Sequence, residues 1–199
     1  YHYPTPVKKA YRFPLVICYS FINRPKILDL QPDRSFIRKL LEQGLDVYLL
    51  DWGDPELKDC QRELASYITE DLHRAIQHIC KNAKVRKINL LGICQGGIFS
   101  LCYTSLFPQK IRKLITMVTP VNFHSSAQPL KKLMKDLNFP SPGQITHNIS
   151  GSLLAHSLQS LKPFRLFEEK FINLFTTENK ALSAETDFFW RMEHWIRDC

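Results

Sequence analysis

Four short apolar segments stand out along the first 121 residues. They are LVICYSF (15–21), LDVYLLDW (45–52), KINLLGIC (87–94) and KLITMVTPV (113–121). Each is almost continuously apolar with little strict alternation, which is typical of strands that are buried on both faces of a sheet. The pattern therefore predicts four buried strands.

Amphipathic segments lie between these runs and predict helices. Residues 33–43 (DRSFIRKLLEQ) form the first, and Gly44 is well suited to end it. The second has apolar residues at spacings of three and four: Leu64, Ile68, Leu72, Ile76 and Ile79. The third covers residues 95–107 and is stopped by Pro108. Alternating strands and helices predict βαβ units, a mostly parallel sheet and the α/β fold class.

The pattern changes after residue 121. Polar residues and scattered aromatic ones follow, and we expect no further buried strand before Cys199. We therefore divide the chain into a core, residues 1–123, and a second part, residues 124–199. The chain has 199 residues and 44% hydrophobic content, which is enough for one globular domain with a sizeable core.

Charge and cysteine content narrow the classes of function. The net charge is +8, and residues 1–100 and 101–199 each contribute +4. This even spread favours a solvated basic surface, although a surface for anionic, nucleotide-bearing ligands stays open. No nucleic-acid-binding motif is present. The six cysteines form no C-x-x-C pair, so we expect no metal site. Without a long apolar run or a signal-peptide pattern, we expect a soluble, cytoplasmic protein.

The stretch NLLGICQGGIFS (89–100) carries the clearest chemical signal. Cys94 follows a predicted buried strand and opens a predicted helix, and Gly92 and Gly96 lie two residues before and after it. Hydrolases use this arrangement, the nucleophile elbow, to raise a nucleophile above a sheet on a tight turn. Gly97 eases helix–sheet packing further. The pattern predicts that Cys94 is a nucleophile, and the alternative is an inert buried cysteine in a tight turn.

Backbone amides around such an elbow can stabilise an oxyanion. The amide of Gln95, at the start of the helix, is one expected donor. The second should come from the loop after the first buried strand, residues 21–23. The N-terminus of the helix also favours the thiolate form of a cysteine that directly precedes it.

Sulfur at this position indicates a kind of chemistry. A cysteine that attacks a thioester exchanges one thioester for another of similar energy, so the acyl group stays activated for onward transfer. A serine ester would store less of that potential. Cys94 therefore favours acyl transfer from a thioester, such as an acyl-CoA, over simple ester hydrolysis.

Three longer blocks carry a family resemblance. They are FINRPKILDLQPDRSFIRKLLEQGLDVYLLDWGDP (21–55), INLLGICQGGIFSLCY (88–103) and LITMVTPVNF (114–123). With them, residues 14–199 resemble the polyhydroxyalkanoate (poly-3-hydroxybutyrate) synthases. Gln95 makes the chain most similar to the catalytic subunit of the two-subunit, short-chain (class III-like) type.

The resemblance implies a fold, a reaction and partners. The fold is the α/β-hydrolase fold with a cap inserted after the sixth strand, so residues 124–199 would be an incomplete cap in a chain truncated at its C-terminus. The reaction is transfer of (R)-3-hydroxyacyl groups from CoA to Cys94 and on to a growing polyester, with CoA released and no cofactor. The backbone amides of Gln95, Ile22 and Asn23 would be the oxyanion contacts. The expected partners are a second copy of the chain, a second synthase subunit and the surface of polyester granules.

The resemblance also implies a histidine that activates the thiol and an aspartate that helps to activate the chain hydroxyl. Both are expected after the cap, so they are not in this chain. Among the residues present, we interpret His73 and His78 as surface or core-edge residues, His124 as a loop residue, and Asp51 as a hydrogen-bonded turn residue. Two alternatives stay open: a cysteine-nucleophile hydrolase of thioesters or lactones, and an inactive truncated fragment that retains only subunit contacts.

Overall fold

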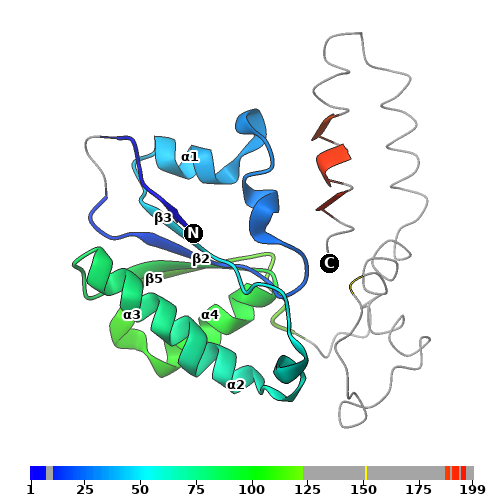
Figure 1. Ribbon diagram of the computed structural model, residues 1–199. Coiled ribbons are helices and arrows are strands. Elements are labelled where there is room, and N and C mark those ends of the chain that lie inside the picture. The colour runs from blue at the N-terminus through cyan, green and yellow to red at the C-terminus, as the bar shows by residue number, and fades with distance from the viewer. Residues whose placement is uncertain (8–10, 123–150, 152–186, 189, 193, 196–199) are drawn as a thin grey trace. The chain divides into compact units, whose positions relative to one another are not determined.

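The computed structural model describes residues 1–7, 11–122, 151, 187–188, 190–192 and 194–195 (Figure 1). The chain divides into two compact units, Tyr1–Phe123 and His124–Cys199. Nearly all described residues belong to the first unit, and the described positions from 187 onward are helical. The expected cap at 124–199 falls almost wholly outside the described residues and stays a prediction.

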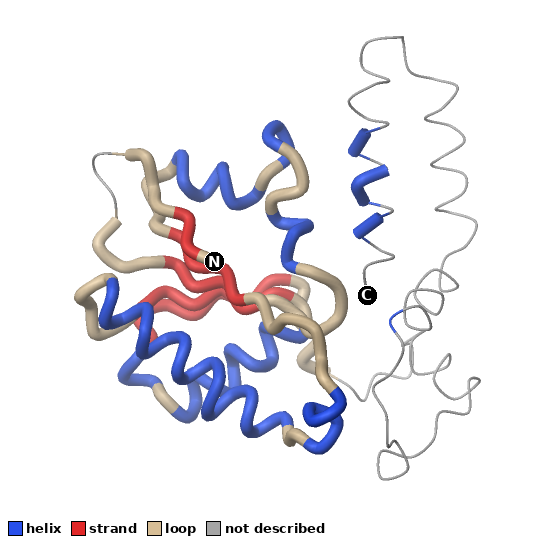
Figure 2. The backbone as a smooth tube through the Cα atoms, in the orientation of Figure 1, coloured by secondary structure: helices blue, strands red, loops and turns tan. Residues whose placement is uncertain are grey.

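A five-stranded sheet forms the centre of the first unit (Figure 2). Its strands are β1 (His2–Tyr3), β2 (Leu15–Cys18), β3 (Val47–Leu50), β4 (Ile88–Ile93) and β5 (Ile111–Met117), in the order β1-β3-β2-β4-β5. Strands β2 to β5 pair in parallel, and β1 pairs antiparallel with β3. All four predicted strands are present, and the mostly parallel sheet is confirmed. The short edge strand β1 was not predicted.

Burial differs between the inner and outer strands. Every residue of β2 and β4 is buried, as expected for strands covered on both faces. The same expectation is wrong for β5, where Ile115 is 48% and Met117 36% exposed. The physical reason is position: β5 is the outer strand of the described sheet, so one of its edges has no described neighbour.

The helices cover both faces of the sheet. They are α1 (Phe36–Glu42), α2 (Leu64–Ser66), the π-helical turn η4 (Tyr67–Leu72), α3 (His73–Asn82) and α4 (Gln95–Leu106), with short 3-10 turns η1 (Pro25–Leu28), η2 (Pro32–Arg34), η3 (Leu57–Gln61) and η5 (Pro108–Lys110). Helix α1 lies on one face, and α2, α3 and α4 lie on the other (Figure 1). Ser35 caps α1 by accepting a hydrogen bond from the Arg38 amide (2.9 Å), and Gly44 follows with φ 82°. In the described part of the chain, the helices are too short or too polar to span a membrane.

The main core lies between the sheet and helices α3 and α4. Leu72, Ile76, Phe99 and Tyr103 are almost fully buried there, together with the strand residues facing them. The predicted apolar stripe is confirmed from Ile68 onward, whereas Leu64, its first member, is 49% exposed. This core supports β4 and α4, the two elements between which Cys94 lies.

Candidate active site

Cys94 occupies the sharp turn between β4 and α4. Its backbone has φ 54° and ψ −125°, a conformation that is costly for any residue other than glycine. The Cys94 amide donates to the carbonyl oxygen of Met117 at 3.0 Å, which fixes the turn to the end of β5. The Cys94 side chain is exposed. The predicted strand–turn–helix arrangement is therefore present, with the thiol at the carboxyl end of an inner strand.

The three elbow glycines lie where no side chain fits. A Cβ on Gly92 would lie 2.6 Å from the Ser100 hydroxyl oxygen, and one on Gly96 would lie 2.6 Å from the carbonyl oxygen of Tyr19. A Cβ on Gly97 would lie 2.6 Å from the Cγ2 atom of Thr119. The turn is thus packed against β2 on one side and against the segment after β5 on the other, and only glycine permits this closeness.

The loop after β2 folds back on itself and onto Gln95. The Ile22 amide donates to the Ser20 hydroxyl oxygen at 2.9 Å, and the Phe21 amide donates to Oε1 of Gln95 at 3.1 Å. The Ser20 hydroxyl also donates to Gln95 Oε1, at 3.3 Å. Asn23 adopts φ 65°. The predicted oxyanion amide of Ile22 is therefore engaged within the loop in this structure, and the roles of Ile22 and Asn23 stay predictions.

Aromatic side chains pack around this loop. The Phe21 ring lies 4.8 Å from the ring centroids of both Tyr67 and Phe99, and 5.0 Å from that of Trp52. Trp52 also donates from Nε1 to the carbonyl oxygen of Tyr19 at 3.0 Å. Tyr67 reaches Phe21 from the π-helical turn η4, a type of turn that is frequent at functional sites. The loop is thus held by packing as well as by hydrogen bonds.

Exposure and position in the fold distinguish Cys94 from the other described cysteines. Burial raises the pKa of the Cys18 thiol to about 12 and also raises the pKa of Cys80. These two thiols are buried, whereas Cys60, Cys94 and Cys102 are exposed. Burial, and to a lesser extent a negative charge at Cys94, raise the pKa of the Tyr19 phenol to about 12. Among the described cysteines, Cys94 alone combines exposure with the elbow geometry.

His73, His78 and Asp51 have hydrogen-bond partners other than Cys94. The Nδ1 atom of His73 lies 3.0 Å from the Tyr103 hydroxyl, and His78 is hydrogen-bonded to Asn82. Asp51 accepts a hydrogen bond from the Gly53 amide at 3.1 Å, which is the turn role expected from the sequence. His124 lies outside the described residues. None of the described histidines of the core is therefore directed to Cys94 as its base.

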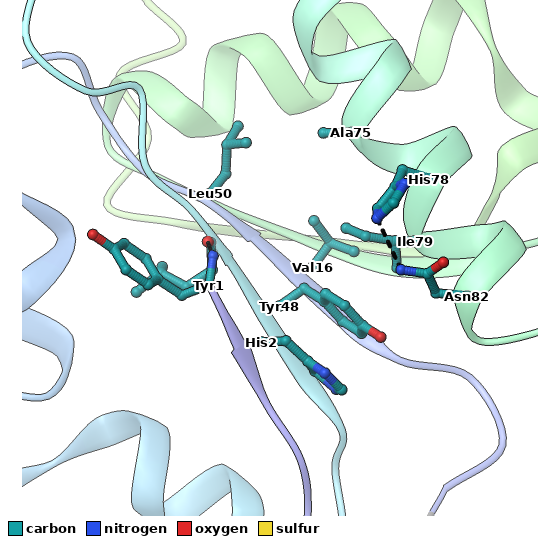
Figure 3. Close-up of a pocket in the computed structure, with 10 residues that line it drawn as sticks. Tyr1, His2, Val16, Tyr48, Leu50, Ala75, His78, Ile79 and Asn82 are labelled. Carbon is teal, nitrogen blue, oxygen red and sulfur yellow. Dashed lines mark hydrogen bonds between the residues drawn. The ribbon is translucent and has the colours of Figure 1, made fainter.

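Two of the cavities on the core are lined by residues other than those of the elbow. One, of about 310 Å³, is lined mainly by apolar residues of β2, β3 and α3, together with Tyr1 and His2, and Figure 3 shows its labelled side chains. The other, of about 610 Å³, lies beside Asp51 and the Arg24–Asp54 ion pair. Neither is lined by Cys94 or Gln95. No group of three potential metal ligands occurs among the residues that the structure describes.

Sequence reasoning missed the Gln95 side chain, Ser20 and Trp52. Each contributes through a partner distant in the chain, such as Gln95 and Ser20, which are 75 residues apart. A signal was nevertheless present, because Ser20 is a polar residue inside an otherwise apolar segment and is buried. A buried hydroxyl of this kind needs a hydrogen-bond partner.

Comparison with known proteins gives a consistent picture. The sequence model described as "alpha/beta hydrolase fold" matches residues 14–191. The chain is 40% identical to "Poly(3-hydroxyalkanoate) polymerase subunit PhaC" of Thiocystis violacea over 199 residues, covering 100% of this chain and 56% of that protein. It is 40% identical to the protein of the same name from Allochromatium vinosum over 198 residues, covering 100% of this chain and 55% of that protein. The chain thus spans about half the length of these curated relatives.

Among solved structures, the chain resembles the mature lipase BlEst2 of Bacillus licheniformis. The TM-score is 0.51 at 18% identity, and the match covers 83% of this chain and 64% of that chain. A likeness at this identity concerns the fold.

Proposed function

Because the chain belongs to the α/β hydrolase fold family, we propose that Cys94 is its nucleophile and that the protein is a poly(3-hydroxyalkanoate) polymerase subunit. The α/β hydrolase fold and the resemblance expected from the sequence are confirmed. The observation that carries the proposal is the exposed Cys94 on a strained strand–helix turn, in a chain similar along its whole length to polymerases of that name.

The proposed reaction has two acyl transfers. The Cys94 thiolate attacks the carbonyl carbon of a 3-hydroxyacyl-CoA, a bond forms to the Cys94 sulfur, and the bond to the CoA sulfur breaks, so CoA leaves. The hydroxyl group of another hydroxyacyl unit then attacks the Cys94 thioester, which forms an ester bond and frees the Cys94 sulfur. Because the acyl group arrives already activated, the reaction needs no cofactor.

Each transfer passes through an oxyanion that backbone amides can stabilise. The Gln95 amide is the first N–H of α4 and has no carbonyl acceptor within the helix, so it is available as a donor. The loop after β2 supplies the second donor. We propose that the proton of the thiol passes to the histidine that the resemblance places after the cap, and that the aspartate placed there helps to remove the proton of the attacking hydroxyl.

Cys94→Ala tests the proposal, and Cys102→Ala is its matched control. Cys102 is a second exposed thiol, on the same helix but away from the turn. In the full-length protein with 3-hydroxybutyryl-CoA, CoA release should be abolished by Cys94→Ala and unchanged by Cys102→Ala. Undiminished CoA release by Cys94→Ala would contradict the role of Cys94. Free hydroxy acid as the sole product, in place of insoluble polyester, would instead support a hydrolase.

The partners are part of the same proposal. We propose a second copy of the chain and a second synthase subunit as protein partners, and the surface of polyester granules as the site of action. The similarity to the named polymerase subunits supports these partners. Size-exclusion chromatography with and without the second subunit measures both associations.

A further inference from the structure

Two hydrogen-bond donors from the loop after β2 converge on one oxygen atom of Gln95. The Phe21 amide lies 3.1 Å and the Ser20 hydroxyl 3.3 Å from Gln95 Oε1. Ser20 in turn accepts the Ile22 amide at 2.9 Å. The Gln95 side chain therefore organises three consecutive residues of the loop.

Gln95 contributes to the proposed oxyanion site through both its backbone and its side chain. The backbone amide of Gln95 is the proposed donor on the elbow side, and its side chain holds the loop expected to carry the other donor. One residue thus joins the two parts of the proposed oxyanion site. Because a side-chain substitution leaves the Gln95 amide in place, the two contributions can be separated experimentally.

The main chains of the loop and the elbow are also in close contact. Gly96 lies so near the carbonyl groups of Cys18 and Tyr19 that no Cβ fits between them. Trp52 Nε1 donates to the Tyr19 carbonyl oxygen, and the rings of Trp52, Tyr67 and Phe99 pack around Phe21. The Phe21 and Ile22 amides donate to Gln95 Oε1 and Ser20 Oγ, and these hydrogen bonds set the conformation of the loop.

We propose that the Gln95 side chain is a positioning residue, which sets the orientation of the loop donors relative to Cys94 through the Phe21 amide and Ser20. This inference rests on the proposed role of Cys94 as an acyl-accepting nucleophile. Misplacing an oxyanion donor by about 1 Å, or losing it, slows acyl transfer by about 10²-fold or more.

The experiment compares two reactions of Cys94 in the full-length protein. Acylation by 3-hydroxybutyryl-CoA or by p-nitrophenyl acetate forms an oxyanion, whereas alkylation by iodoacetamide is a displacement at carbon that forms none. Gln95→Met, which keeps the side-chain length and removes the acceptor oxygen, should lower the acylation rate by roughly 10- to 100-fold. The alkylation rate should stay within about 3-fold, because the thiol itself is untouched.

Further variants supply the controls. Gln109→Met makes the same exchange at an exposed glutamine of η5 and should change neither rate. Gln95→Glu keeps acceptor oxygens for the Phe21 amide and the Ser20 hydroxyl, so it should recover much of the acylation rate.

Ser20→Ala tests whether Ser20 and Gln95 act as a unit. If they do, the double variant Ser20→Ala/Gln95→Met is acylated about as fast as Gln95→Met alone, because the linked bonds are lost together. Independent, multiplicative losses would overturn the inference. Acylation of Gln95→Met at the parent rate would also overturn the inference. Faster acylation would overturn it as well, because it would show that Gln95 Oε1 prevents the loop amides from acting as donors. An equal fall in alkylation would assign the defect to the thiol.

Reactions of the unmutated protein with the two acyl donors distinguish a failure of the proposed function from a failure of this inference. Acylation of Cys94 by p-nitrophenyl acetate without CoA release from 3-hydroxybutyryl-CoA would refute the polymerase and leave the Gln95 comparison intact. Failure of both acyl donors to acylate Cys94 would refute both.

Discussion

A methyl group at Gly96 would meet the main chain of β2. Its Cβ would lie 2.6 Å from the carbonyl oxygen of Tyr19 and 2.7 Å from the carbonyl carbon of Cys18, and real Cβ atoms essentially never come within 3.0 Å of such neighbours. Strand β2 cannot move away, because it is paired with β3 on one side and β4 on the other. In Gly96→Ala the displacement must therefore occur in α4, which carries Gln95 and follows Cys94.

The size of the effect follows from these contacts. Overpacking a tight interior by a methyl group costs about 1–3 kcal/mol, and contact with a fixed main chain belongs at the upper end of that range. Alanine in a helix gains roughly 0.5–1 kcal/mol over glycine, which offsets only part of this. We expect Gly96→Ala to lower the free energy of unfolding by about 2 kcal/mol. A shift of α4 by roughly 1 Å should also slow acylation of Cys94 by about 100-fold.

Gly97→Ala is the matched comparison, because its obstacle is a side chain. The Cβ would lie 2.6 Å from Cγ2 and 2.8 Å from Cβ of Thr119. Thr119→Gly removes both atoms, so it should relieve Gly97→Ala, with a favourable coupling of about 1 kcal/mol or more in a double-mutant cycle. The same Thr119→Gly should give no relief to Gly96→Ala, whose neighbours are main-chain atoms.

Urea unfolding followed by tryptophan fluorescence measures the free energies, and p-nitrophenyl acetate measures the acylation rates. The reasoning fails if Gly96→Ala lies within about 0.5 kcal/mol of the parent, the range of ordinary surface substitutions. It also fails if Thr119→Gly relieves both alanine variants equally, since the two obstacles would then be the same.

Two further predictions concern buried groups of the core. Burial raises the pKa of Cys18 from 9.0 to about 12, so the folded state retains a proton that the unfolded chain loses above pH 9.0. The contribution of the thiol to stability is thus complete below pH 9.0 and declines as the pH approaches about 12. The difference in free energy of unfolding between the parent and Cys18→Ala should therefore be smaller at about pH 10.5 than at about pH 8. A constant or growing difference would contradict this. Tyr103→Phe removes the hydroxyl 3.0 Å from His73 Nδ1 and should cost about 1 kcal/mol of stability without slowing acylation of Cys94, as unfolding and acylation assays on one sample would show.

The fold could be predicted where the chain pattern is long or the turn chemistry is specific. Continuous apolar runs gave the four strands, and Gly44 and Pro108 gave the ends of α1 and α4. Strand β1 has two residues, too few for any periodicity, and it forms because it pairs with β3 and because His2 stacks on Tyr48 at 4.1 Å. The exposure of β5 could not be predicted either, since burial depends on which elements cover a strand and not on its own residues.

The candidate site could be predicted only where its residues are neighbours in sequence. Spacing alone placed Cys94 on a strand–helix turn, because the glycines that the turn needs are its neighbours in sequence. Two contacts of the site join residues that are far apart in the chain: the hydrogen bond between Ser20 and Gln95, and the packing of Tyr67 on Phe21. They depend on how the strands and helices pack together. The Ile22 amide, an expected oxyanion donor, instead donates a hydrogen bond to the Ser20 hydroxyl oxygen. The two residues are close in sequence, but the pattern of apolar residues gives no information about this bond.

Three of the four described non-glycine residues with positive φ follow strands at the carboxyl edge of the sheet, and the fourth, Lys84, precedes β4. Asn23, Cys94 and Val118 follow the three neighbouring strands β2, β4 and β5, and all have positive φ, at 65°, 54° and 46°. Each such residue costs about 1–3 kcal/mol, and Val118, being β-branched, belongs at the high end. The buried strands β2 and β4 and the core under α4 can hold this strain because they are packed independently of the turns. Strain kept in place by a rigid core means that the thiol and the amides around it are oriented before any substrate binds. A nucleophile that must accept an acyl group and then release it to a second acceptor needs that orientation twice, which is the physical reason for proposing Cys94 as the residue through which the acyl group passes.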